Sequence, residues 1–143
     1  MYTQIHFASD LKKETPKEVI DILKAMDNGT AFELYEKQLP NHDFFKCGHW
    51  AYLFTMGSAY FDYDTTHHFG KQEWSDTYNL SVTSNLKNYS DEIDLFIDWI
   101  TPYLDKQDGD FLGYSRYEET EIPTLIYHPN KLFTPDVPKE ITN

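Results

Sequence analysis

The sequence predicts an α+β fold, a two-layer sandwich in which a mostly antiparallel sheet of about five or six strands carries two helices on one face. Three observations predict it: a length of 143 residues that suits one domain, two amphipathic helical segments, and short alternating segments around them. The element order is that of a split βαβ, or ferredoxin-like, fold. We expect residues 1–128 to form this domain. Residues 129–143, which contain three prolines, are expected to be an extended or disordered tail.

The first helical segment has a clear beginning and end. Thr15 is the expected N-cap, Pro16 occupies the first helical position, and Glu18 completes a capping box. Gly29 can adopt the left-handed conformation that ends a helix. Between them runs an apolar stripe at helical spacing, formed by Val19, Ile22, Leu23 and Met26.

The second helical segment begins at Ser90 and has acidic residues in its first turn, where the helix dipole favours negative charge. Pro102 ends or kinks it, because proline lacks the N–H that would continue the helix. Its apolar stripe is formed by Ile93, Phe96, Ile97 and Ile100.

The strands are predicted from alternation of apolar and polar side chains. Residues 3–8 and 78–83 alternate directly before each helix, and residues 111–117 and 124–128 are expected to form a hairpin. Residues 50–56 are apolar on both faces, which is typical of a central strand. Residues 59–64 could pair with them across a short turn.

Aromatic residues are concentrated in the middle of the chain. Eight of the 20 residues from Phe44 to Tyr63 are aromatic, against 17% overall. Two helices cover only one face of a sheet, so loops or the tail must cover the other face. Otherwise an aromatic patch remains exposed for contact with a protein or ligand. We expect Trp50 and Tyr52 at such a contact.

Negative charge is concentrated in another segment. The net charge is −12, and residues 91–121 contribute −8 of it, with ten acidic and two basic residues. Spacings of three and four place three aspartates on one helix face. One interpretation is a solvated face that keeps the protein in solution, and the other is a surface that binds a basic protein. The predicted partner-binding residues are Asp91, Asp94, Asp98, Glu118, Glu119, Glu121, Trp50 and Tyr52.

Composition argues against several classes of function. An acidic chain whose only arginine is Arg116 is not expected to bind nucleic acid directly. A single cysteine allows no internal disulfide. Without a leader-like start or a membrane-length apolar run, we expect a cytoplasmic protein with no membrane partner. Eleven of the twelve basic residues are lysine, which favours an AT-rich coding genome, bacterial or phage.

Motifs for catalysis or metal binding are lacking, and we expect no metal and no cofactor. His42 and His49 do not have a recognised metal-ligand spacing, and residues 105–110 do not follow the pattern of an EF-hand loop. Cys47 lies near His49 in sequence, but a cysteine nucleophile also needs an oriented base, and a buried thiol is the commoner case.

Three functional hypotheses follow. The leading one is a small acidic, non-enzymatic binding or inhibitory module that engages a basic protein surface, as phage counter-defence or toxin-immunity proteins do. The second is a small-molecule-binding or catalytic domain with a pocket in the aromatic middle segment. The third is a homo-oligomeric structural subunit, the choice between monomer and homodimer being open. The candidate polar groups of the second are Cys47, His49, Tyr52 and His67.

Overall fold

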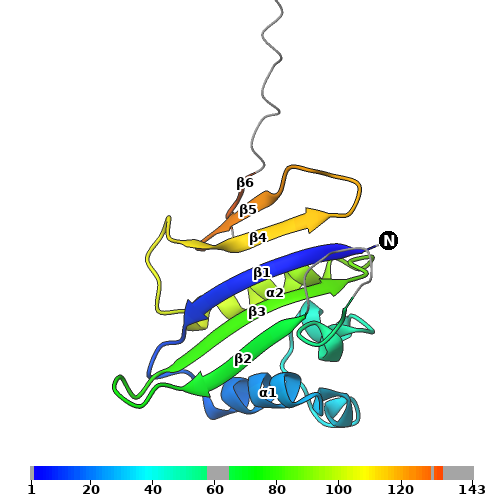
Figure 1. The fold of residues 1–143 in the computed structure, drawn as a ribbon. Coiled ribbons are helices and arrows are strands. Elements are labelled where there is room, and N and C mark those ends of the chain that lie inside the picture. Colours follow the sequence, from blue (N-terminus) through cyan, green and yellow to red (C-terminus); the bar gives the residue numbers. More distant parts are fainter. Residues whose placement is uncertain (1, 58–64, 130, 134–143) are drawn as a thin grey trace, which may run out of the picture.

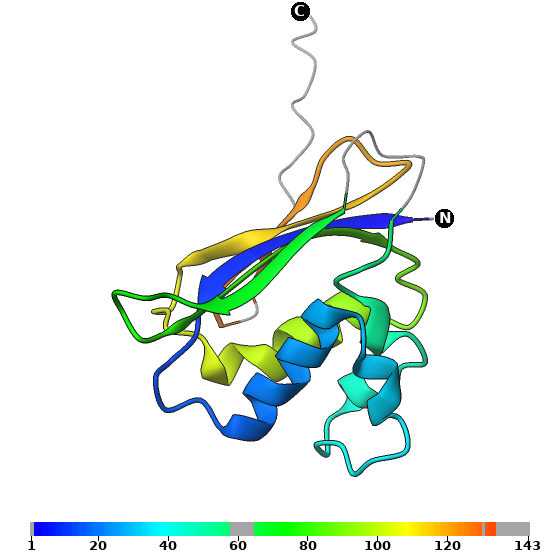
Figure 2. The same ribbon diagram turned by 60° about the horizontal axis from the view of Figure 1, so that its bottom comes forward.

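Six antiparallel strands form one sheet in the order β2-β3-β1-β4-β5-β6, and two helices lie together on one of its faces (Figures 1 and 2). The computed structural model describes residues 2–57, 65–129 and 131–133. The α+β sandwich with both helices on one face is therefore confirmed. The strands are β1 (Thr3–Asp10), β2 (Thr66–Lys71), β3 (Tyr78–Leu86), β4 (Phe111–Tyr117), β5 (Thr124–Tyr127) and β6 (Lys131–Phe133). The helices are α1 (Lys17–Asn28) and α2 (Glu92–Ile100), with short 3₁₀ helices η1 (Ala31–Leu34), η2 (Asp43–Lys46), η3 (Trp50–Tyr52) and η4 (Thr101–Tyr103).

The connections form two interleaved split βαβ units. Strand β3 lies between β1 and β2, which α1 connects, and β1 lies between β3 and β4, which α2 connects. Strands β5 and β6 extend the sheet beyond β4, so a ferredoxin-like order is not confirmed for the sheet as a whole. Strand β6 lies inside the segment that the sequence predicted as a tail, and residues 130 and 134–143 lie outside the described residues.

Helix α1 begins later than its sequence predicts. Pro16 is the N-cap, with φ −58° and ψ 145°, and its carbonyl accepts from the backbone N–H of Val19 at 3.1 Å. The Thr15 hydroxyl donates to the Lys12 carbonyl at 2.6 Å, so the predicted capping box is wrong. Gly29 does end the helix, at φ 75° in the left-handed region, as predicted.

Helix α2 begins at Glu92, two residues after the predicted start. Asp91 is its N-cap and has a left-handed φ of 57°. The Asn88 side-chain oxygen accepts from the Ile93 N–H at 3.0 Å, and the buried Glu92 carboxylate accepts from the Ser90 N–H at 3.1 Å. The apolar stripe of α2 is buried as predicted.

The strand predicted at 50–56 is wrong. Trp50–Tyr52 is a 3₁₀ helix, and residues 31–57 pass through three such helices beside α1 and α2 (Figure 2). Trp50 and Phe54 are fully buried, so apolar side chains on both sides of this segment reflect packing within the helical layer. A short apolar run does not distinguish a central strand from a buried turn of helix. The predicted partner strand, 59–64, lies outside the described residues.

Aromatic side chains form the centre of the helical layer. The Phe96 ring of α2 makes edge contacts with Phe7 of β1, Phe44 of η2 and Phe54, with centroids 5.5–5.6 Å apart. Phe44 also stacks on Trp99 at 5.8 Å. Phe44, Phe45, Trp50 and Phe54 therefore pack beneath the sheet and contribute to one core with α2.

The other face of the sheet is mostly polar along β1 and β3. Ile5 and Phe7 face the helices, so their neighbours Gln4 and His6 lie on the opposite face. His6 Nδ1 lies 2.9 Å from the Thr83 hydroxyl of β3, and the His6 ring stacks on Tyr114 of β4. Phe44, Trp50 and Phe54 do not lie on this face, because they belong to the helical layer, whereas Tyr114 does.

Candidate functional site

The exposed side of α2 carries the three aspartates that the sequence placed on one face, Asp91, Asp94 and Asp98. We call them the α2 acidic face. Within the described part of the chain, neither Asp91 nor Asp94 forms an ion pair, and α2 itself contains no basic residue. Partial burial, and then the charge of Asp91, raise the pKa of Asp94. Two neighbouring carboxylates thus lie at this surface without a compensating cation.

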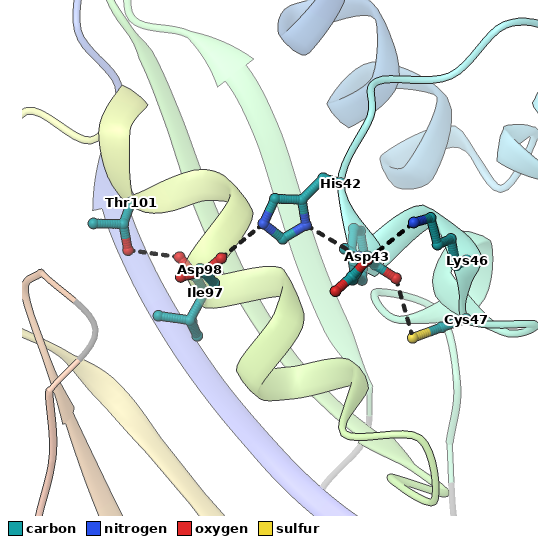
Figure 3. A network of polar contacts seen from close by, with 8 residues as sticks. His42, Asp43, Lys46, Cys47, Ile97, Asp98 and Thr101 are labelled. Atoms are coloured by element: carbon teal, nitrogen blue, oxygen red, sulfur yellow. Dashed lines mark hydrogen bonds and ion pairs between the residues drawn. The ribbon is translucent and has the colours of Figure 1, made fainter.

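Asp98 has a structural contact that the sequence did not reveal. Its carboxylate accepts a hydrogen bond from His42 Nε2 at 2.8 Å (Figure 3). His42 Nδ1 accepts from the Phe44 backbone N–H at 3.0 Å, so the ring proton of the neutral form must be on Nε2. Because both ring nitrogens are occupied, His42 joins η2 to α2 and is not positioned to act as a general base.

The thiol that was considered as a nucleophile is buried. Cys47 is 8% exposed, and its sulfur lies 3.6 Å from the Ser90 carbonyl oxygen and 3.8 Å from that of Asp43. Burial, and then the charges of Glu92, Asp43 and Asp91, raise the pKa of this thiol. A reactive cysteine needs the opposite environment, one that stabilises the thiolate.

The other candidate polar groups have separate surroundings. His67 of β2 is hydrogen-bonded to Asp27 of α1 at 2.7 Å, whereas His49 and Tyr52 are exposed around η3. Among the described contacts, the Tyr52 N–H donates to the His49 carbonyl at 3.1 Å, and no side-chain contact joins any two of Cys47, His49, Tyr52 and His67. The sequence could not have indicated the histidine–aspartate contacts of Asp27 and Asp98, since the partners are 40 and 56 residues apart.

Trp50 cannot belong to a binding surface in this structure. Its exposed fraction is 0%, because its ring packs against Tyr35, Phe44 and Phe45. Tyr52 is 39% exposed and remains available for contact. The part of the prediction that concerns Trp50 is corrected: alternation along an assumed strand placed it on a sheet face, whereas it lies in the helical core.

Glu118, Glu119 and Glu121 lie on or beside the turn between β4 and β5. Thr3 pairs with Leu86 of β3 and with Tyr117 of β4, so this turn is at the end of the sheet from which the chain enters α2. Burial and the charges of the adjoining glutamates raise the pKa of Tyr117. Asp91, at the start of α2, is thus at the same end of the sheet as the three glutamates. Asp94 and Asp98 lie further along α2, so the predicted acidic residues do not all share one region.

Replacing Asp94 with asparagine is expected to stabilise the protein at pH 7. The folded-state pKa is raised, so the stability associated with the protonated carboxyl is present at low pH and is lost as pH rises through that pKa. Asparagine avoids the cost of partly burying a carboxylate and removes the repulsion from Asp91, and the second effect alone raises the free energy of unfolding by about 0.2–0.5 kcal/mol. Thermal unfolding should show a higher Tm for Asp94→Asn at pH 7 and no difference near pH 3. An equal gain at both values would show that charge is not the cause, and Glu33→Gln, at an exposed site on η1, is the control.

Comparison of the chain with protein-family models, with curated proteins and with solved structures finds no match. In the described part of the chain, no helix is long and apolar enough to cross a membrane.

Proposed function

We propose that the protein is a small, non-enzymatic binding module that engages a basic protein surface through the α2 acidic face. The observation that carries the proposal is the pair Asp91 and Asp94, which are exposed, adjacent and without an ion-pair partner in the described part of the chain. An inhibitor or immunity protein that neutralises a basic toxin or enzyme is a role of this kind.

Electrostatics supports the proposal in two ways. Three of the ten acidic residues in 91–121 lie on the exposed side of α2, so the field at this face attracts cationic partners over a distance set by the salt concentration. A basic side chain that approaches Asp94 would also favour its charged form and so lower the pKa that burial and the charge of Asp91 raise. Binding should therefore be accompanied by proton release near the pKa of this carboxyl.

Neutralising the two unpaired aspartates is expected to weaken binding several-fold. The variant Asp91→Asn with Asp94→Asn retains a residue that tolerates the left-handed φ at position 91 and leaves the Asp98–His42 contact intact. Titration with an oligolysine peptide, followed by NMR, should show shifts concentrated on α2 in the wild type. The matched control, Glu33→Gln with Glu36→Gln, removes the same charge from the exposed 33–36 segment.

Salt provides the second readout. Wild-type affinity for the peptide should fall steeply between low and high salt, since attraction between exposed charges is screened. If the control variant loses as much affinity as the α2 variant, binding depends on net charge and not on this face. In that case the proposal fails.

A further inference from the structure

Trp74 lies at the tip of the turn between β2 and β3 and is 87% exposed. The other two tryptophans, Trp50 and Trp99, are 0% and 4% exposed. A tryptophan in this position contributes nothing to the core. Large aromatic side chains that are exposed in the free protein and buried on association are the commonest anchors of protein interfaces.

The turn that carries this indole is held by several polar contacts. The Gln72 N–H donates to the Thr77 carbonyl at 2.9 Å, and the Ser75 hydroxyl lies within 2.9 Å of the Gln72 and Thr77 side-chain oxygens. Lys71 and Asp76 form an ion pair at 2.8 Å. The indole is therefore presented on a preformed support, which lowers the entropic cost of burying it against a partner.

A hollow suited to an aromatic ring lies at the same end of the molecule. Its volume is about 300 Å³, and it borders a second hollow of about 280 Å³ that reaches Thr77 of the turn. The Leu11 N–H donates to the Tyr78 carbonyl at 2.9 Å, which holds the loop after β1 beside the β2–β3 turn. The first hollow is lined by Lys12, Glu14, Thr15, Pro16, Pro102 and Tyr103.

We propose that two copies of this chain form a dimer in which Trp74 of each copy occupies the hollow of the other. The indole and the hollow lie at one end of the molecule, so a two-fold axis satisfies both contacts at once and closes the assembly. Two prolines and a tyrosine supply the flat apolar surface on which an indole packs.

The charges around the hollow are complementary to those of a second copy. Two chains with a net charge of −12 repel one another, so they can meet only where charges of both signs are available. Lys12 and Lys13 form no ion pair within the described residues. Glu14 and Asp105 line the same hollow as these lysines, and Glu73 lies beside Trp74 on the β2–β3 turn. Lysines of one copy can therefore face acidic residues of the other. The α2 acidic face is not used, so a dimer would present it twice.

The proposal is tested with the purified protein alone. Sedimentation velocity should show a mass rising towards that of two chains with increasing concentration. Fluorescence quenching by acrylamide should decrease in parallel, since Trp74 is the one exposed tryptophan of three. Trp74→Ala should remain a monomer with unchanged thermal stability, whereas Phe32→Ala, at another exposed aromatic, should dimerise as the wild type does. A wild type that stays monomeric throughout, or a Trp74→Ala variant that still dimerises, overturns the proposal.

Mixing two variants gives a sharper test. Pro102→Glu introduces a charge into the hollow, and this variant alone should be monomeric like Trp74→Ala. An equimolar mixture of Pro102→Glu and Trp74→Ala should contain dimer, because Trp74 of the Pro102→Glu chain can enter the intact hollow of the Trp74→Ala chain. A mixture that stays monomeric overturns the two-fold arrangement. Neither assay involves a basic partner, so their failure would leave the proposed function of the α2 acidic face unaffected.

Discussion

Replacing Gly113 with alanine is expected to destabilise the protein by at least about 4 kcal/mol, the range reserved for changes that the fold cannot absorb. Gly113 of β4 lies opposite Phe7 of β1. A Cβ atom there would overlap the carbonyl oxygen of His6 and lie 2.7 Å from its carbonyl carbon and 3.0 Å from the Phe7 Cα. Strand β1 cannot withdraw, since it is hydrogen-bonded to β3 on its other side. Circular dichroism and the soluble yield at expression measure the effect.

Gly48→Ala is the matched control. An added Cβ at this exposed loop position has no atom within 4 Å, so the Gly48→Ala protein should be about as stable as the wild type. A Gly113→Ala protein as stable as Gly48→Ala would show that β4 does not approach β1 this closely.

Replacing Phe96 with alanine is expected to lower the free energy of unfolding by about 3–5 kcal/mol, as for other fully buried phenylalanines. Its side chain is 0% exposed and is in contact with rings from β1, η2 and the segment after η3. Truncation would leave a cavity where the sheet, α2 and the 31–57 segment meet. Urea denaturation should show the loss as a lower midpoint.

Two further variants distinguish packing from a general loss of apolar surface. Phe96→Leu keeps most of the volume and should cost less than Phe96→Ala. Phe111→Ala, at a position that is 52% exposed, should cost little. If Phe96→Ala cost no more than Phe111→Ala, the central position of Phe96 in the core would be contradicted.

The elements that the sequence predicted correctly are those with local signals. The stripe of α2 and the glycine that ends α1 depend on spacings of a few residues, and both are confirmed. Thr15 satisfied the same kind of rule but was wrong as a cap, because its hydroxyl bonds to Lys12 instead. Strand β2 was missed, since His67 and His68 interrupt the alternation that identifies a strand.

In the candidate site, too, the sequence predicted what depends on near neighbours in the chain and missed what depends on distant segments. Helical spacing was sufficient to place Asp91, Asp94 and Asp98 on one face of α2, because neighbours on a helix are determined by the chain itself. It could not show that Asp98 binds His42, which comes from a segment 56 residues away. Nor could it show that Trp50 is buried, because its burial depends on rings that pack around it in the folded chain, among them that of Tyr35.

The sequence by itself determined the fold class, the two amphipathic helices and the concentration of negative charge on and after α2. These properties depend on composition and on short-range periodicity. Tertiary structure decided that Phe44, Trp50 and Phe54 belong to the helical core, that the sheet face away from the helices is mostly polar along β1 and β3, and that the acidic residues share one end only in part. Those outcomes depend on which distant segments pack together, and packing free energy comes from contacts that no local pattern contains.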